Sequence, residues 1–144
     1  MSIKENKDLI RQCWKSFEET GGDATKMRVL YHMFYTADTI FHNPNGDMTL
    51  EQRMSFMKPV AEALPDSKFE IDDMVAEGDK VAIRYTWKAT HKGTFMGIPA
   101  TGKKIAVKGL EIDRIAAGKI LEIWELLDFQ GMMTQLGVAP APKM

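Results

Sequence analysis

The chain has 144 residues, of which 44% are hydrophobic and 27% are charged, and its formal net charge is −1. Its length allows one domain, which we expect to cover residues 1–144, and its near-neutrality offers no basic surface for nucleic acid or for an anionic membrane. No apolar run approaches the roughly 20 residues needed to cross a bilayer, and the charged N-terminal segment lacks the apolar core of a signal peptide, so we expect a cytoplasmic protein.

The first half of the chain has helical periodicity. Apolar residues recur every three to four positions in three segments, which predicts helices over residues 3–19, 24–36 and 50–63. Asp23 is placed to cap the second helix, and Thr49 with Gln52 forms a capping-box pattern for the third. A short extended segment, residues 39–42, lies between these two helices.

From Lys68 the hydrophobic period changes to two, which predicts strands joined by tight turns. The predicted strands cover 68–76, 80–91, 104–115 and 119–128, with an irregular loop over 92–103. A short helix follows from Gly131, and the residues from Ala139 read as a tail. Three helices followed by hairpin-linked strands indicate an α+β fold, with helices on one face of a curved antiparallel sheet.

The last predicted hairpin brings two glutamates together. If its turn centres on Ala117-Gly118, facing residues sum to about 236, and Glu111 opposes Glu125 on the same face, with β-carbons ~4.5–5.5 Å apart. In an apolar hollow, desolvation and mutual repulsion would raise at least one carboxyl pKa, so one group could act as acid and the other as base. A one-residue bulge would instead put the two glutamates on opposite faces.

Strand alternation predicts a mostly apolar pocket face with these glutamates in it. Its other members are Val81, Ile83, Tyr85, Trp87, His91, Ile105, Val107, Ile123 and Leu127. The opposite face would carry Leu110, Ile112, Ile120, Trp124 and Leu126. That is too much apolar surface for a free monomer, so we expect a homodimer or a higher homo-oligomer.

Four further residues each have a functional and a structural interpretation. His91 could act in acid–base chemistry or hydrogen-bond to backbone at its strand end, and His42 could face the pocket or support its turn. Trp14 could line the pocket or fill the core. Asp128 could reach the pocket mouth or cap the helix that follows.

The sequence offers no metal-binding pattern. Cys13 is the single cysteine, which excludes an intrachain disulfide and a cysteine-based zinc site, and we expect a buried thiol rather than a nucleophile. The three histidines, His32, His42 and His91, have no ligand spacing, so we predict no metal. We also expect no cofactor.

Two segments carry a family resemblance. Thr90–Lys103 is similar to the His-x-Gly…Gly-x-x-x-Thr-Gly-Lys loop of SnoaL-like proteins, and Gly118–Asp128 resembles their Gly-Lys-Ile-x-Glu-x-Trp-x-x-x-Asp ending. Glu77–Val81 also fits, and the resemblance to the SnoaL-like polyketide cyclase family covers essentially the whole chain. It implies a cone-shaped fold like that of nuclear transport factors and ketosteroid isomerases, with oligomers built on sheet faces.

The resemblance also implies an activity. Characterised cyclases of the family close a polyketide ring by intramolecular aldol condensation, without cofactor or metal. Their acid–base aspartate matches Glu125, and their pocket tryptophan matches Trp14. A histidine and a glutamine that help to bind the enolate match Glu111 and Gly109, so this chain lacks both of those side chains.

The first functional hypothesis is a cofactor-independent cyclase, isomerase or dehydratase acting on a small, largely apolar carbonyl compound. Glu125 would be the base, and protonated Glu111 would donate to the developing enolate. We expect catalytic roles for Glu125, Glu111, His91 and Asp128, and substrate contacts from Trp14, Tyr85, Trp87, His42, Ile123 and Leu127. The alternatives are a non-catalytic protein that binds an apolar small molecule, and an interaction scaffold whose hollow is filled by side chains.

Overall fold

The computed structural model describes residues 2–138, so the tail expected from Ala139 lies outside it. The elements are α1 (Ile3–Glu19), α2 (Ala24–Phe34), β1 (Tyr35–Asn43), β2 (Gly46–Thr49), α3 (Leu50–Ala63), β3 (Lys68–Glu77), β4 (Lys80–Thr90), β5 (Lys104–Ala116), β6 (Lys119–Leu127) and α4 (Phe129–Gln135). The expected α+β order is therefore confirmed. Within residues 2–138, no helix is long and apolar enough to cross a membrane.

Local capping explains where α2 and α3 begin. The Thr49 hydroxyl accepts the Gln52 N–H while the Gln52 side chain accepts the Thr49 N–H, which is the predicted capping box. Asp23 accepts the Lys26 N–H at 2.9 Å. The second helix ends two residues earlier than predicted, because Tyr35 adopts an extended backbone and starts β1.

The six strands form one sheet in the order β2-β1-β6-β5-β4-β3. All neighbouring strands are antiparallel except the pair β1 and β6, which runs parallel and sets Phe41 beside Ile123. The sequence predicted only four residues of β1 and no partner for it. Buried Thr39 joins the two strands where their register is irregular, since its hydroxyl donates to the Ile120 carbonyl at 2.8 Å and accepts the Thr36 N–H at 2.9 Å.

The β5–β6 hairpin confirms the predicted register of the two glutamates. Next to the Ala117-Gly118 turn, where both residues have positive φ, Ile115 faces Ile120. The register then shifts by one residue, and Glu111 faces Glu125. This bulge turns Ile120 inward to full burial, so its expected place on the outer face was wrong.

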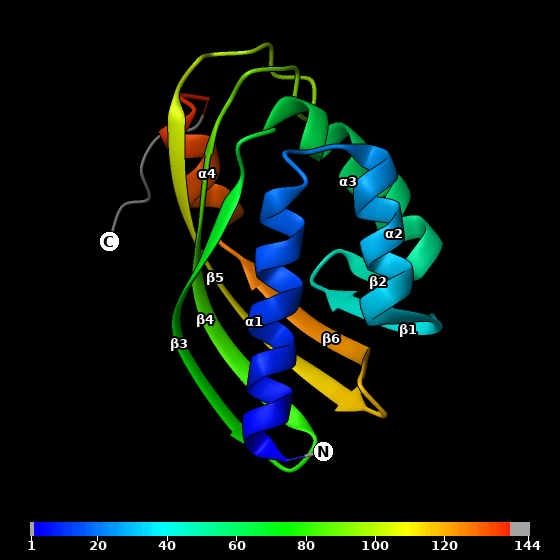
Figure 1. The fold of residues 1–144 in the computed structure, drawn as a ribbon. Helices are drawn as coiled ribbons and strands as arrows, with labels where there is room; N and C mark the ends of the chain where they lie inside the picture. Colours follow the sequence, from blue (N-terminus) through cyan, green and yellow to red (C-terminus); the bar gives the residue numbers. More distant parts are fainter. Residues whose placement is uncertain (1, 139–144) are drawn as a thin grey trace.

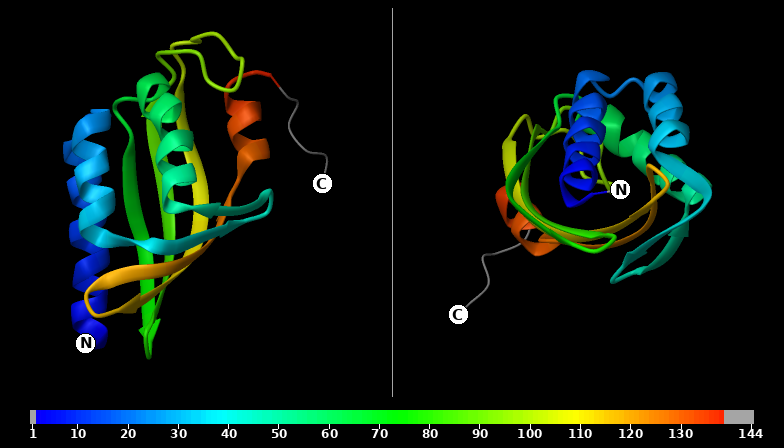
Figure 2. Two further views of the ribbon diagram at one scale, coloured as in Figure 1. Left: turned by 90° about the vertical axis from the view of Figure 1, so that its right-hand side faces the viewer. Right: turned by 60° about the horizontal axis from the view of Figure 1, so that its bottom comes forward.

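The sheet curls into an incomplete cone. Figure 2 shows it wrapping around α1, while α2 and α3 cover the rest of the concave side (Figure 1). The predicted inward-facing apolar residues, such as Val81, Ile83 and Val107, are buried, and Leu110, Ile112 and Leu126 are exposed on the outside. The strand alternation read from the sequence therefore holds through β4 and β5.

α4 occupies the edge of β5 beyond the end of β6. The Gln135 side-chain amide makes a pair of hydrogen bonds to the Ala106 backbone, accepting its N–H at 2.7 Å and donating to its carbonyl at 2.9 Å. The Asp128 N–H donates to the Lys108 carbonyl at 3.0 Å, at the start of the same edge. A side chain thus takes the part of a neighbouring strand at this edge.

Replacing Gln135 by alanine removes both bonds to Ala106. We expect the free energy of unfolding to fall by about 1 kcal/mol, because each bond is partly exposed and its net contribution is small. Urea unfolding of Gln135→Ala measures this, with Gln12→Ala at an exposed position of α1 as the matched control. Equal stability of the two variants would show that α4 is held by its apolar contacts alone.

Candidate active site in the cone

A cavity of about 830 Å³ lies between the concave sheet face and helices α1–α3. Most of its lining is aromatic or aliphatic, and the segment after β4 adds Phe95 and Met96 at its rim. Eight of the predicted site residues line it: Trp14, Tyr85, Trp87, Glu111, Ile123, Glu125, Leu127 and Asp128. Side chains therefore do not fill the hollow, which disfavours the scaffold hypothesis.

Aromatic side chains from α1, β3 and β4 form one wall. The Trp14 ring meets the Tyr85 ring edge to face at 5.0 Å between centroids, and Phe69 stacks on Trp87 at 5.7 Å. The Trp87 indole N–H donates to the Ser67 hydroxyl at 2.9 Å, which satisfies its polar atom. The wall is therefore apolar, and this hydrogen bond fixes the orientation of the Trp87 ring.

Tyr85 needs a glycine opposite it. It pairs with Gly109 of β5, and a β-carbon at position 109 would lie 2.3 Å from the Tyr85 Cζ atom. Burial raises the pKa of the Tyr85 phenol, so the group stays neutral and can donate a hydrogen bond. Gly109 therefore makes room for a phenol that lines the cavity.

Glu125 is paired with Arg53 of α3, which the sequence analysis missed. Both guanidinium Nη atoms donate to the carboxylate, and the Nη2–Oε2 distance is 2.8 Å. The two side chains are only 19% and 13% exposed, and the guanidinium also lies 4.8 Å from the centre of the Phe41 ring. The expected pair of uncompensated glutamates was therefore wrong, because Arg53 neutralises one of them.

A helical pattern could have identified Arg53. Met57 and Val60 follow it by four and seven residues, so the three share one face of α3, and all line the cavity. In the sequence only the apolar residues of that face, among them Met57 and Val60, were singled out. A cation on that face indicated a buried anion across the cavity.

Glu111 has a closer acidic neighbour than Glu125. Asp113 lies two residues along β5 on the same face and is fully buried. Burial, then the charge and hydrogen bond of Asp113, then the charge of Glu125, raise the pKa of Glu111 well above its usual range. Burial also raises the pKa of Asp113, to about 6.

Two other buried groups border the carboxyls. Cys13 is fully buried, as predicted, with its Sγ 3.9 Å from the Tyr35 hydroxyl, and burial raises the pKa of its thiol. Burial likewise raises the pKa of Tyr35 well above its usual range. Both are therefore neutral, and neither compensates a carboxylate charge.

The structure places both candidate histidines away from the cavity lining. His91 is fully buried and holds the 92–103 loop, since its Nδ1 accepts the Thr101 N–H at 3.2 Å. His42 lies on the outer face between Asp47 and Glu122, at 2.8 and 2.7 Å, and its ring stacks on Trp124. For both, the structural interpretation fits the geometry better than the expected role in catalysis or substrate contact.

The position of Asp128 agrees with both of the interpretations given above. It caps α4 by accepting the Gly131 N–H at 2.9 Å, and it also lines the cavity. A β-carbon at position 131 would lie 2.1 Å from its Oδ2 atom, so the cap depends on that glycine. Its carboxylate is thus partly committed to the helix.

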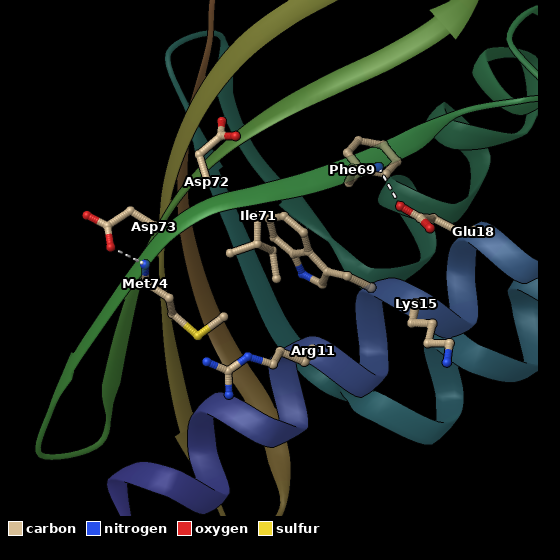
Figure 3. Close-up of a pocket in the computed structure, with 9 residues that line it drawn as sticks. Arg11, Lys15, Glu18, Phe69, Ile71, Asp72, Asp73 and Met74 are labelled. Atoms are coloured by element: carbon tan, nitrogen blue, oxygen red, sulfur yellow. Dashed lines mark hydrogen bonds between the residues drawn. The ribbon is translucent and has the colours of Figure 1, made fainter.

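A second cavity of about 520 Å³ lies between α1 and β3 (Figure 3). Trp14 borders both cavities, and Glu18 accepts the Phe69 N–H at 2.8 Å at the inner end. Arg11 lines this second cavity but is already bonded to Asp8 at 3.0 Å on the exposed helix surface. Across residues 2–138, no three His, Cys, Asp or Glu side chains are grouped to hold a metal ion.

The fold and this cavity define a class: a cone-shaped α+β domain with a cavity between its sheet and helices. The chain belongs to the SnoaL-like polyketide cyclase family, whose model matches residues 13–136. The resemblance noted in the sequence is therefore confirmed.

Individual relatives support the same family. Aklanonic acid methyl ester cyclase DauD from Streptomyces sp. (strain C5) is 24% identical over 132 residues, which cover 90% of this chain and 80% of DauD. The structure of AclR from Streptomyces galilaeus, a proposed hydroxylase, matches with a TM-score of 0.85 and 26% identity over 96% of this chain and 100% of AclR. That of IdmH from Streptomyces antibioticus, a proposed polyketide cyclase, matches with a TM-score of 0.77 and 27% identity over 92% of this chain and 99% of IdmH.

Replacing Glu125 by glutamine leaves the Arg53 guanidinium without its counter-charge. We expect the free energy of unfolding to fall by about 3 kcal/mol, the cost of breaking a largely buried pair on one side. Urea unfolding measures it, and Arg53→Met combined with Glu125→Gln should cost less than the two single changes together.

The matched control is Glu70→Gln, which breaks an exposed pair with Lys88 and should change stability by less than about 0.5 kcal/mol. If Glu125→Gln is as neutral as this control, the Arg53–Glu125 pair does not contribute to folding.

Proposed function

We propose that the protein is a cofactor-independent acid–base enzyme that closes a ring in a small, largely apolar carbonyl compound. One observation carries this proposal: Glu111 and Glu125 face each other in an apolar cavity, in opposite electrostatic surroundings. Glu125 is paired with a cation, whereas Glu111 lies beside Asp113 without one. Such a difference between two carboxyls assigns one as base and the other as acid.

In the proposed reaction, a Glu125 oxygen removes a proton from the carbon next to a carbonyl group. The electrons of the C–H bond move to the carbonyl oxygen, and the Glu111 and Tyr85 hydroxyls donate to the resulting enolate. The enolate carbon then attacks a second carbonyl of the same molecule while its own C=O bond re-forms, and the new alkoxide takes the proton that Glu125 removed, which regenerates the base. The product is an isomer of the substrate, so no oxidant or reductant is needed.

Arg53 fits this mechanism as an orienting group. A carboxylate offers about four acceptor positions, and the guanidinium uses two of them, so Glu125 retains acceptor positions for substrate. The pairing fixes the direction of the Glu125 carboxylate. The alternative, a non-catalytic binding protein for apolar compounds, has no need of buried carboxyls.

The test uses aklanonic acid methyl ester, the compound named for DauD, in D₂O. We expect a ring-closed product whose mass differs from that of the substrate only by exchanged deuterium. The exchange arises at the carbon that loses its proton. Glu125→Gln should slow both exchange and ring closure at least ~100-fold, the usual contribution of a general base. Liquid chromatography with mass spectrometry follows both.

Glu70→Gln, on the exposed side of β3, should leave both rates unchanged. If the wild-type protein quenches its Trp14 and Trp87 fluorescence on binding but catalyses neither exchange nor ring closure, including with simple aryl ketones, the binding-protein alternative replaces this proposal.

We also propose that two copies associate through the outer sheet face. Leu110 faces Leu126 and Ile112 faces Trp124 across β5 and β6, and all four side chains are exposed in one patch. A patch at the centre of a sheet can match a second copy about a two-fold axis. The cone leaves this part of the convex side without a covering helix (Figure 2).

Light scattering should give twice the chain mass of 16.3 kDa, and Leu110→Lys with Leu126→Lys should halve the measured value, because four charges would meet in one apolar contact. His32→Lys, at an exposed helix position, is the control. A stable single-chain mass for the wild type at high micromolar concentration would contradict the dimer.

A further inference from the structure

Asp113 is a buried acid that the proposed reaction leaves without a role. Its side chain is fully buried, and no donor among residues 2–138 reaches either of its carboxylate oxygens when both are treated as acceptors. Its partners across the ladders are Val81 and Ile123, which are also buried. An ionised carboxylate in such a place would be strongly destabilising unless another group compensated it.

No Lys or Arg among the described residues forms an ion pair with Asp113, and the charge of Arg53 lowers its pKa by less than burial raises it. Arg53 is the only Lys or Arg among the described residues that line the cavity, and both of its Nη atoms are bound to Glu125. Burial and the charge of Asp113 both raise the pKa values of Cys13 of α1 and Tyr35 of β1, so both groups are neutral. Tyr85 of β4 lies opposite Gly109, and burial, then the charge of Glu111, raises its pKa, so it too stays neutral.

Glu111 is the neighbouring carboxyl on the same face of β5, two residues from Asp113, and a hydrogen bond from it lowers the pKa of Asp113. Two carboxyl groups can form a hydrogen bond only if one of them carries a proton, because two carboxylates have no donor between them. Strand alternation puts both on the cavity face of β5, with Glu111 at the cavity surface and Asp113 deeper.

We propose that Glu111 and Asp113 share one proton, and that Asp113 is a positioning residue that keeps Glu111 protonated near neutral pH. The negative charge of the carboxyl groups at the cavity would then be compensated in two different ways. Glu125 is compensated by a guanidinium, and the Glu111–Asp113 pair is compensated by its proton. The pair carries one negative charge where full ionisation would give two.

The catalytic part of this inference rests on the proposed function. When a substrate oxygen gains negative charge against Glu111, the Glu111 O–H bond breaks and an O–H bond to the substrate forms. The pair then carries two negative charges in an apolar place, which favours return of the proton at the end of the cycle. Asp113 therefore helps Glu111 to recover its proton after each cycle.

The experiment is a carboxyl-resolved ¹³C NMR titration of the protein without any substrate. In the wild type, the Glu111 and Asp113 resonances should each respond to both ionisation steps, because the pair titrates as a unit. In Asp113→Asn the neighbouring charge is gone and an amide N–H can donate to Glu111, so the Glu111 midpoint should fall, although burial still keeps it above that of an exposed glutamate. Asp38→Asn, an exposed residue of β1, should leave it unchanged.

An unchanged Glu111 midpoint in folded Asp113→Asn would overturn the proposal. If Asp113→Asn does not fold, Asp113→Ser makes the same test: the Glu111 midpoint should fall, and an unchanged midpoint refutes the shared proton. In a turnover assay, the limb that falls with rising pH reports loss of the Glu111 proton, so Asp113→Asn should move it to lower pH with little change in KM. Failure of the titration would refute the pair, whereas failure of Glu125→Gln to slow proton exchange would refute the proposed function.

Discussion

The pairing of β5 with β6 decides which side chains enter the cavity. A strand has a side-chain period of two, so a slip of one residue would turn Glu125 to the outer face. The Ala117-Gly118 turn alone sets Ile115 against Ile120, and the bulge that follows restores the register in which Glu111 faces Glu125. Because of the bulge, both Ile120 and Ile123 are buried, although they are three positions apart and simple alternation would put them on opposite faces. The same irregularity therefore buries the core side chains of the hairpin and places Glu125 at the cavity.

The charges of the site connect the helices to the sheet. Glu111, Asp113 and Glu125 come from two neighbouring strands, while their single cation, Arg53, comes from α3 on the opposite wall. Three ionised acids against one guanidinium would leave two uncompensated charges in an apolar space, so protonation is the least costly way to reduce them. Apolar residues at these positions would stabilise the fold more than this arrangement does. Polar groups that cost stability in a cavity indicate a chemical function.

Strand alternation and the family resemblance were sufficient to predict the cone, the cavity face and the Glu111–Glu125 register. The parallel pairing of β1 with β6 was missed because it joins segments about eighty residues apart, and Tyr35 and Thr36 continue a helical pattern. His42 was misplaced for the same reason, since its face depends on that pairing. Arg53 was missed because a helix pattern does not show what lies across a cavity. Asp113 was visible in the alternation, two positions from Glu111, and was passed over because only facing pairs were compared.

The resemblance matched an enolate-binding histidine and glutamine of the family to positions 111 and 109, which here are Glu111 and Gly109. The structure gives a physical reason why both can change together. The Tyr85 hydroxyl lies 2.5 Å from where a β-carbon at position 109 would be, so it occupies the space in which a glutamine side chain would begin. A phenol from β4 can thus supply the donor that β5 lacks, and it does so only because residue 109 is glycine. A carboxyl at position 111 can replace a histidine as donor only when protonated, and Asp113 beside it favours that state. Under the proposed mechanism, the two departures from the family pattern are each compensated by a neighbour, Tyr85 for one and Asp113 for the other.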